Sequence, residues 1–144
     1  MLRGHFRLYR SWIALPCVVL VLAASSAGGA TDPLEHCGAK KLGAIASACE
    51  RVEITELNVH TWGFEGDQAA KLETQRRFYR DVVAACLAVD ACRATTLWLF
   101  TDRYPTTIEQ TLGQDGMPLV FDDEYRRKPA YFGVRAGLLA VPRP

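Results

Sequence analysis

Glu56 is the residue of this chain that most clearly suggests catalysis, because its carboxylate stands near the end of a short β-branched segment. The pattern of residues 52–59 predicts a β-strand, and a second strand is predicted at residues 94–100, leading into Asp102. An amphipathic helix is predicted between them, at residues 68–89. Enzymes built as barrels of alternating strands and helices place catalytic groups at the C-terminal ends of the strands. The sequence therefore predicts a fragment of an active site that contains Glu56.

The composition is that of an ordinary globular protein. The chain has 144 residues, of which 49% are hydrophobic and 23% charged, and its formal net charge is +1. A net charge this close to zero argues against a dedicated nucleic-acid or membrane-surface binder, because such proteins carry a basic excess. Neither a glycine-rich phosphate loop nor a His/Cys/Asp cluster at metal-ligand spacing is present in the sequence. We therefore expect no metal and no cofactor.

The N-terminal 30 residues have the order of a secretory signal peptide. Residues 1–10 carry three arginines and no acid, residues 13–24 are apolar, and residues 25–30 are small. An uncleaved membrane anchor is the alternative, but the apolar run falls short of the roughly 20 residues that span a bilayer. We expect a signal peptide at residues 1–30, cleavage near Ala30, secretion to the periplasm or the cell exterior, and a mature chain without membrane contact.

Cleavage near Ala30 would leave four of the five cysteines in the mature chain. Cys37 and Cys49 flank a predicted helix at residues 39–48, which would hold them about 18 Å apart. That distance is far beyond the limit for a disulfide. Cys86 and Cys92 instead flank a short connection between a helix end and a strand start. Since an exported chain meets an oxidising compartment, we expect a Cys86–Cys92 disulfide.

The predicted elements alternate as helix, strand, helix, strand and helix, the last at residues 130–139 after Pro129. This order favours an α/β fold with a parallel sheet. The apolar residues of 52–59 do not alternate cleanly, which is typical of a strand buried on both faces. Two parallel strands do not make a stable sheet alone. The sequence therefore predicts that part of the sheet is supplied by missing sequence or by a partner.

Four segments resemble glycoside hydrolase family 10, the endo-1,4-β-xylanases. In that family the matching motifs are the nucleophile motif of strand seven, the seventh helix with its paired cysteines, the strand-eight motif, and the closing segment before the final helix. The corresponding segments here are Ile54–Val59, Phe78–Cys92, Leu97–Tyr104, and Pro118–Asp122 with Lys128–Tyr131. The resemblance implies that residues 31–144 are the C-terminal portion, about strands 7–8 with flanking helices, of an incomplete TIM (β/α)8 barrel.

The resemblance also implies residue roles. Glu56 would be the nucleophile in retaining hydrolysis of β-1,4-xylan, and Trp98 would wall the sugar site beside the cleaved bond. Retaining enzymes need a second carboxyl group about 5 Å away. In the family it lies in a Trp-Asp-x-x-Asn-Glu context on strand four, and this chain contains no such stretch. Asn58, Leu99 and Pro105 also depart from the family pattern. We expect the isolated chain to be inactive.

Other interpretations of the same residues stay open. Taken alone, Glu56 is an ordinary strand-end carboxylate and Trp98 a core aromatic residue. His60 and Trp62 indicate a surface loop rather than a distal sugar site, and the basic run 126–128 indicates a solvated turn. For the whole chain, the alternatives are a non-catalytic remnant that binds sugar or pairs with a separate chain supplying the missing barrel half, and an unrelated small secreted α/β domain.

Overall fold

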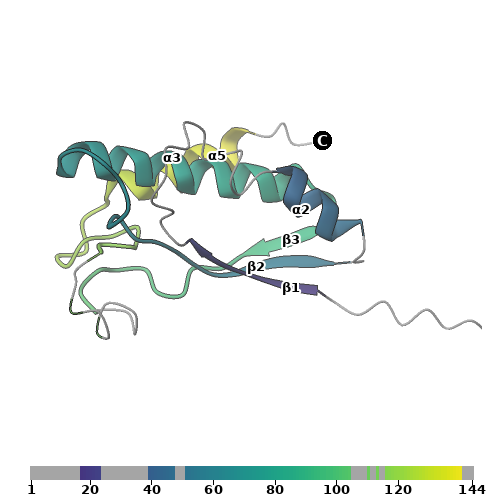
Figure 1. Ribbon diagram of the computed structural model, residues 1–144, viewed down its shortest axis with the longest axis horizontal. Coiled ribbons are helices and arrows are strands. Elements are labelled where there is room, and N and C mark those ends of the chain that lie inside the picture. Colours follow the sequence, from purple (N-terminus) through teal and green to yellow (C-terminus); the bar gives the residue numbers. More distant parts are fainter. Residues whose placement is uncertain are drawn as a thin grey trace, which may run out of the picture.

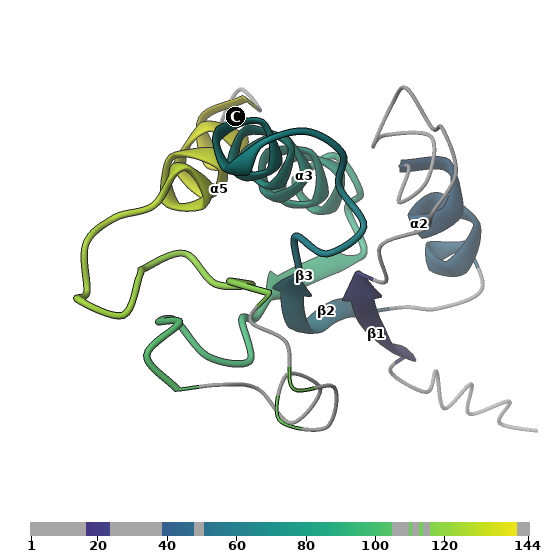
Figure 2. The same cartoon turned by 60° about the vertical axis from the view of Figure 1, so that its left-hand side comes forward.

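A computed structural model describes residues 17–23, 39–47, 51–104, 110, 113 and 116–140. Its strands are β1 (Cys17–Ala23), β2 (Val52–Val59) and β3 (Cys92–Thr95), and its helices are α2 (Ala39–Ala46), α3 (Gln68–Leu87) and α5 (Pro129–Ala140). The strands form one sheet in the order β1-β2-β3, with both pairings parallel. Helices α3 and α5 lie side by side along one face of this sheet (Figures 1 and 2). In both views the other face carries no helix among the described residues.

Strand β2 has the predicted bounds, but its irregular apolar pattern has a different cause from the one expected. Between Thr55 and Asn58, β2 contains one residue more than the paired stretch of β1, so it carries a β-bulge. The bulge shifts the alternation by one residue. As a result Val52 and Ile54 before it, and Leu57 and Val59 after it, all enter the same core. Asn58, which alternates with Leu57 and Val59, is also buried, whereas Glu53 and Thr55 are half-exposed, so β2 is buried on both faces only near its C-terminal end.

The second strand was predicted at residues 94–100, too far toward the C-terminus, because β3 covers Cys92–Thr95. Hydrogen bonding to β2 continues only to Thr96, whose N–H donates to Ile54 O at 2.8 Å and whose carbonyl accepts from Leu57 N at 2.9 Å. The chain then leaves the sheet, and Phe100 O accepts a hydrogen bond from Phe121 N at 2.9 Å. Residues 97–100 therefore form a segment that crosses toward residue 121, although their composition is that of a strand.

Helix α3 begins at Gln68 and is capped by Asp67, whose carboxylate accepts a hydrogen bond from Ala70 N at 2.9 Å. It ends at Leu87, two residues earlier than predicted. Its inner face contributes Tyr79, Val82 and Cys86 to the core that also holds the apolar side chains of β2. This packing fixes β2 beneath α3, so the outer face of the sheet carries the remaining side chains of the strand.

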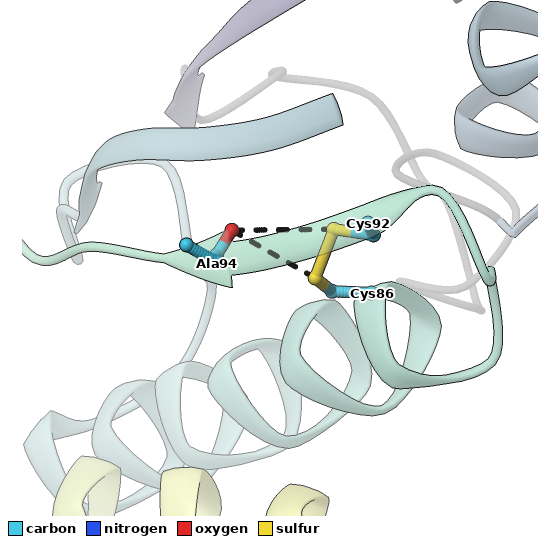
Figure 3. Close-up of a disulfide and its surroundings, with 3 residues drawn as sticks. All are labelled: Cys86, Cys92 and Ala94. Atoms are coloured by element: carbon cyan, nitrogen blue, oxygen red, sulfur yellow. Dashed lines mark hydrogen bonds between the residues drawn. A yellow bond between two sulfur atoms is a disulfide. The ribbon is translucent and has the colours of Figure 1, made fainter. Parts of the chain in front are cut away.

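The Cys86–Cys92 disulfide is formed, as predicted, and joins the end of α3 to the start of β3 (Figure 3). The two Cα atoms lie 5.3 Å apart, and the sulfur atoms of Cys86 and Cys92 contact Ala94 O at 3.8 and 4.0 Å. The prediction concerning Cys37 and Cys49 falls outside the described residues.

Replacing both bridged cysteines by alanine is expected to lower the free energy of unfolding by about 2 kcal/mol, because the bridge closes a short loop of the unfolded chain. Urea denaturation of the Cys86→Ala, Cys92→Ala double variant measures the loss. Reducing agent should produce a similar shift in the original chain and none in the variant. A reductant effect that persists in the variant would contradict this assignment of the stabilisation.

Residues 17–23 lie inside the predicted signal peptide, yet they form strand β1. The rest of residues 1–30 lies outside the described part of the chain. None of the helices in the described part combines the length and the apolar character that a bilayer span requires.

Candidate active site

Glu56 occupies the bulge of β2 with a left-handed backbone, at φ 56°. A non-glycine residue pays a conformational cost in this region, and such residues cluster where the surrounding structure holds a functional side chain in place. Its neighbours Ile54 and Leu57 both enter the core, whereas Glu56 is half-exposed. The bulge therefore keeps the carboxylate out of the core and near the carboxyl end of the strand.

Trp98 follows directly on the last hydrogen bonds between β2 and the segment after β3. Thr96, two residues before it, is bonded to Ile54 and Leu57, the residues that bracket the bulge. The chain therefore brings Trp98 to the carboxyl end of the sheet, the end near which Glu56 lies. Its side chain is 55% exposed, which excludes the alternative that it is a core aromatic residue of this chain. An exposed indole face can stack on a sugar ring.

A layer of buried polar groups supports the end of β2. Gln75 Nε2 of α3 donates to Val59 O at 2.7 Å and to Met117 O at 2.6 Å. Tyr79 Oη donates to Pro118 O at 2.6 Å. Burial, with a smaller contribution from the charge of Asp102, raises the pKa of Tyr79, so its hydroxyl stays a hydrogen-bond donor. These bonds attach residues 117–118 to the strand that carries Glu56.

The ion pair between Asp102 and Lys128 was missed by sequence reasoning. Lys128 Nζ lies 2.5 Å from Asp102 Oδ2, and the two side chains are 7% and 8% exposed. Lys128 Nζ also donates to Met117 O at 2.7 Å, and Asp102 Oδ1 accepts from Leu119 N at 2.8 Å. The prediction of a solvated turn is therefore wrong for Lys128, although Arg126 and Arg127 are exposed. The pair ties three segments together beside the candidate site.

His60 and Trp62 do not form the surface loop that the sequence favoured. His60 is buried, and its ring stacks on that of Trp62 with the centroids 4.3 Å apart. Both rings pack so closely on Gly116 that a Cβ there would lie 2.6 Å from His60 Cδ2. Thr61 N and Oγ1 also donate to Gly116 O, at 2.9 and 3.0 Å. No short stretch of sequence signals this contact, because Thr61 and Gly116 are 55 residues apart along the chain.

Within the described residues no group of three or more His, Cys, Asp and Glu side chains is arranged to hold a metal ion. The candidate site consists of one carboxylate in a strand bulge and one exposed indole that follows the neighbouring strand, and a buried polar layer holds the end of β2.

Comparison with known proteins identifies the family. The sequence model of glycosyl hydrolase family 10 matches residues 31–137. The chain belongs to this family. An endo-1,4-β-xylanase of Agaricus bisporus is 37% identical over 86 residues, which are 60% of this chain and 25% of that protein. Endo-1,4-β-xylanase 1 of Humicola insolens is 35% identical over 87 residues, 60% of this chain and 20% of that protein.

Solved structures of the family agree with the fold. Native xylanase 10B of Thermotoga maritima superposes with a TM-score of 0.62 at 26% identity, over 71% of this chain and 31% of that one. The glycosylated endo-β-1,4-xylanase of Gloeophyllum trabeum gives 0.60 at 33% identity, over 70% and 31%. Family 10 xylanases have the TIM barrel fold, and this chain spans between a fifth and a third of the length of these relatives. The chain is therefore a partial portion of a barrel, as the resemblance implied.

Proposed function

We propose that this chain carries the nucleophile-bearing end of a barrel that hydrolyses β-1,4-xylan with retention of configuration. In this proposal β2 is strand seven of the barrel and β3 is strand eight. The observation that carries it is the position of Glu56, which a strand bulge holds out of the core in a chain of family 10.

Glu56 is the nucleophile in the proposed reaction. Its carboxylate attacks the anomeric carbon, the glycosidic oxygen leaves with a proton from a separate acid, and a covalent glycosyl-enzyme forms. Water activated by the same acid, now a base, then hydrolyses this intermediate. Trp98 stacks on the sugar next to the cleaved bond. The acid is missing from this chain, and losing it costs on the order of 10²–10⁴ in rate. The isolated chain is therefore inactive.

The chain meets its substrate outside the cell in this proposal. Residues 1–30 act as the signal peptide and residues 31–144 as the exported part, and the family match begins at residue 31. Xylan is the polysaccharide partner, and the remainder of the barrel supplies the acid. No nucleic acid and no cofactor take part.

A complementation assay tests the proposal. The chain is mixed with the complementary part of a family 10 xylanase, cut before its seventh strand, and release of reducing sugar from xylan is measured. Hydrolysis is expected only in the mixture, and not with Glu56→Gln. Glu53→Gln is the matched control, because Glu53 is a half-exposed carboxylate of the same strand.

Two results would contradict the proposal. Sugar release by the isolated chain that disappears in Glu56→Gln would show that the acid is present after all. Equal activity of the Glu56→Gln and Glu53→Gln mixtures would exclude Glu56 as the nucleophile. The alternative function, a non-catalytic remnant or carbohydrate-binding subunit, is favoured by the exposure of Trp98. It predicts xylan binding that depends on Trp98 and is unchanged in Glu56→Gln.

A further inference from the structure

Trp98 lies in a short span of chain that is hydrogen-bonded at both ends. At the first end, Thr96 bonds to β2. At the second end, Phe100 O accepts a hydrogen bond from Phe121 N at 2.9 Å. Residues 97–99 connect these two anchors, so the position of Trp98 depends on where the second anchor stands relative to β2.

The second anchor belongs to a segment that lies beyond the sheet. Asp102 N donates to Phe121 O at 3.0 Å, and Thr101 Oγ1 donates to Asp122 O at 2.6 Å. Thr101 also pairs with Phe121 as a single parallel β-bridge. These bonds fasten the two stretches of chain side by side. The second anchor of Trp98 is therefore positioned by the segment that contains Phe121, rather than by β3.

Residues 116–118 attach this segment to α3 and to the end of β2. Each of their carbonyl oxygens accepts two hydrogen bonds, respectively from Thr61 N and Oγ1, from Gln75 Nε2 and Lys128 Nζ, and from Val59 N and Tyr79 Oη. A carbonyl oxygen has two lone pairs, so all three acceptors are fully used. This attachment fixes where the segment begins relative to the strand that carries Glu56.

Lys128 connects that attachment to the segment of Trp98. Its ammonium group donates to Met117 O at 2.7 Å and lies 2.5 Å from Asp102 Oδ2. Met117 O is also bonded to Gln75, which in turn holds the end of β2. The side chains of Lys128 and Asp102 are less than a tenth exposed, so water competes little for these contacts. A buried ammonium group thus links the chain just after Trp98 to the end of β2.

We propose that Lys128 is a positioning residue of the hydrolytic site, whose ammonium group sets where the indole of Trp98 stands relative to Glu56. The inference rests on the roles proposed above for these two residues. Lys128 acts through Asp102 and Met117 and does not touch the sugar. A buried ion pair that only stabilises can be replaced by apolar side chains without loss, whereas a pair that positions another residue cannot.

A double-mutant cycle separates positioning from stability. The double variant Asp102→Leu, Lys128→Met leaves neither charge of the pair in the core and is expected to stay folded, which its urea midpoint verifies. Trp98→Ala is introduced into this variant and into the original chain. For all four proteins, kcat/KM on xylan is measured in the complementation mixture.

The double variant is expected to lower kcat/KM by at least about threefold, and Trp98→Ala should then cost at least about threefold less than it does in the original chain. Residues that act through one another have effects that are not additive in free energy. Arg126→Met is the matched control, because this exposed residue pairs with Asp122 and Glu124. Its effect and that of Trp98→Ala should simply multiply.

Hydrogen exchange in the chain without sugar gives a second measurement. The amides of Asp102, Leu119 and Phe121 bond across the two segments that the pair joins. In the double variant they should lose protection by at least about tenfold, because the link between these segments opens locally. The amides of Leu57 and Thr96, which bond β2 to the chain after β3, should keep their protection.

Multiplicative effects of Trp98→Ala and the double substitution, or unchanged protection of the three amides, would overturn the proposal. If the double variant does not fold, Asp102→Asn takes its place. Its amide has one acceptor oxygen instead of two, so it cannot serve both Leu119 N and Lys128 Nζ, and the same two results are expected. A mixture of the original chain that does not hydrolyse xylan counts against the proposed function, whereas hydrogen exchange still decides whether Lys128 fixes the segment of Trp98.

Discussion

Replacing Lys128 by methionine is expected to destabilise the chain by about 3–5 kcal/mol, because it leaves the buried carboxylate of Asp102 without its cation. Both side chains are less than a tenth exposed, and the ammonium group also holds Met117 O. Methionine matches the length of the lysine stem, so the loss of packing is small. The midpoint of urea denaturation, followed by circular dichroism, measures the effect.

The matched control is Arg126→Met, two residues earlier. Arg126 pairs with Asp122 and Glu124, but its side chain is 68% exposed, so solvent screens these pairs and their loss should change the stability little. The double variant Asp102→Leu, Lys128→Met should recover much of the stability lost in Lys128→Met, because no charge then remains buried. Equal losses in Lys128→Met and Arg126→Met would contradict the description of a buried, structurally required pair.

The contrast between these two basic residues shows where local sequence stops being informative. Arg126, Arg127 and Lys128 are adjacent and of similar type, yet only Lys128 is buried. Its partner Asp102 is 26 residues away along the chain, so a short stretch of sequence around Lys128 does not contain the reason for its burial. His60 was misjudged in the same way, because Gly116, which it contacts, is also distant in sequence.

Features that depend on neighbouring residues were predicted well. The bounds of β2 follow from its β-branched residues, and the Cys86–Cys92 bridge follows from the short connection between α3 and β3. The β-bulge left a signal in the sequence. The apolar residues stand at even-numbered positions before it, Val52 and Ile54, and at odd-numbered positions after it, Leu57 and Val59. That change was assigned to burial on two faces, because a bulge is defined by pairing with another strand.

The end of β3 illustrates competition between propensity and topology. Leu97 to Phe100 have the composition of a strand, but Phe100 O bonds to Phe121 N and residues beyond Thr96 leave the sheet. Trp98 lies in this departing segment and is exposed. The candidate site was therefore found through the family motifs, whereas the geometry that makes it accessible depends on contacts that a single sequence does not show.

Replacing Gly133 by alanine is expected to destabilise the chain by about 1–3 kcal/mol, as overpacking of a well-packed contact does. An added Cβ at Gly133 of α5 would lie 2.1 Å from Arg76 O in the backbone of α3. Because a helix backbone cannot move aside as a side chain does, the two helices must separate. Gly137 approaches Arg80 O in the same way, at 2.6 Å, so Gly137→Ala should cause a smaller loss.

Gly43→Ala in α2 is the matched control, because nothing lies within 4 Å of its added Cβ. There the substitution is expected to stabilise the chain by up to about 1 kcal/mol, since alanine favours the helix more than glycine does. The same chemical change thus has opposite signs at the two sites. Urea denaturation of the two variants checks both signs, and a stabilising effect of Gly133→Ala would contradict the close contact between α5 and α3. Helix α3 also packs on the apolar residues of β2, so separation of α3 from α5 should weaken the packing of the strand that carries Glu56. Gly133→Ala should therefore reduce hydrogen-exchange protection in residues 52–59, whereas Gly43→Ala should leave it unchanged.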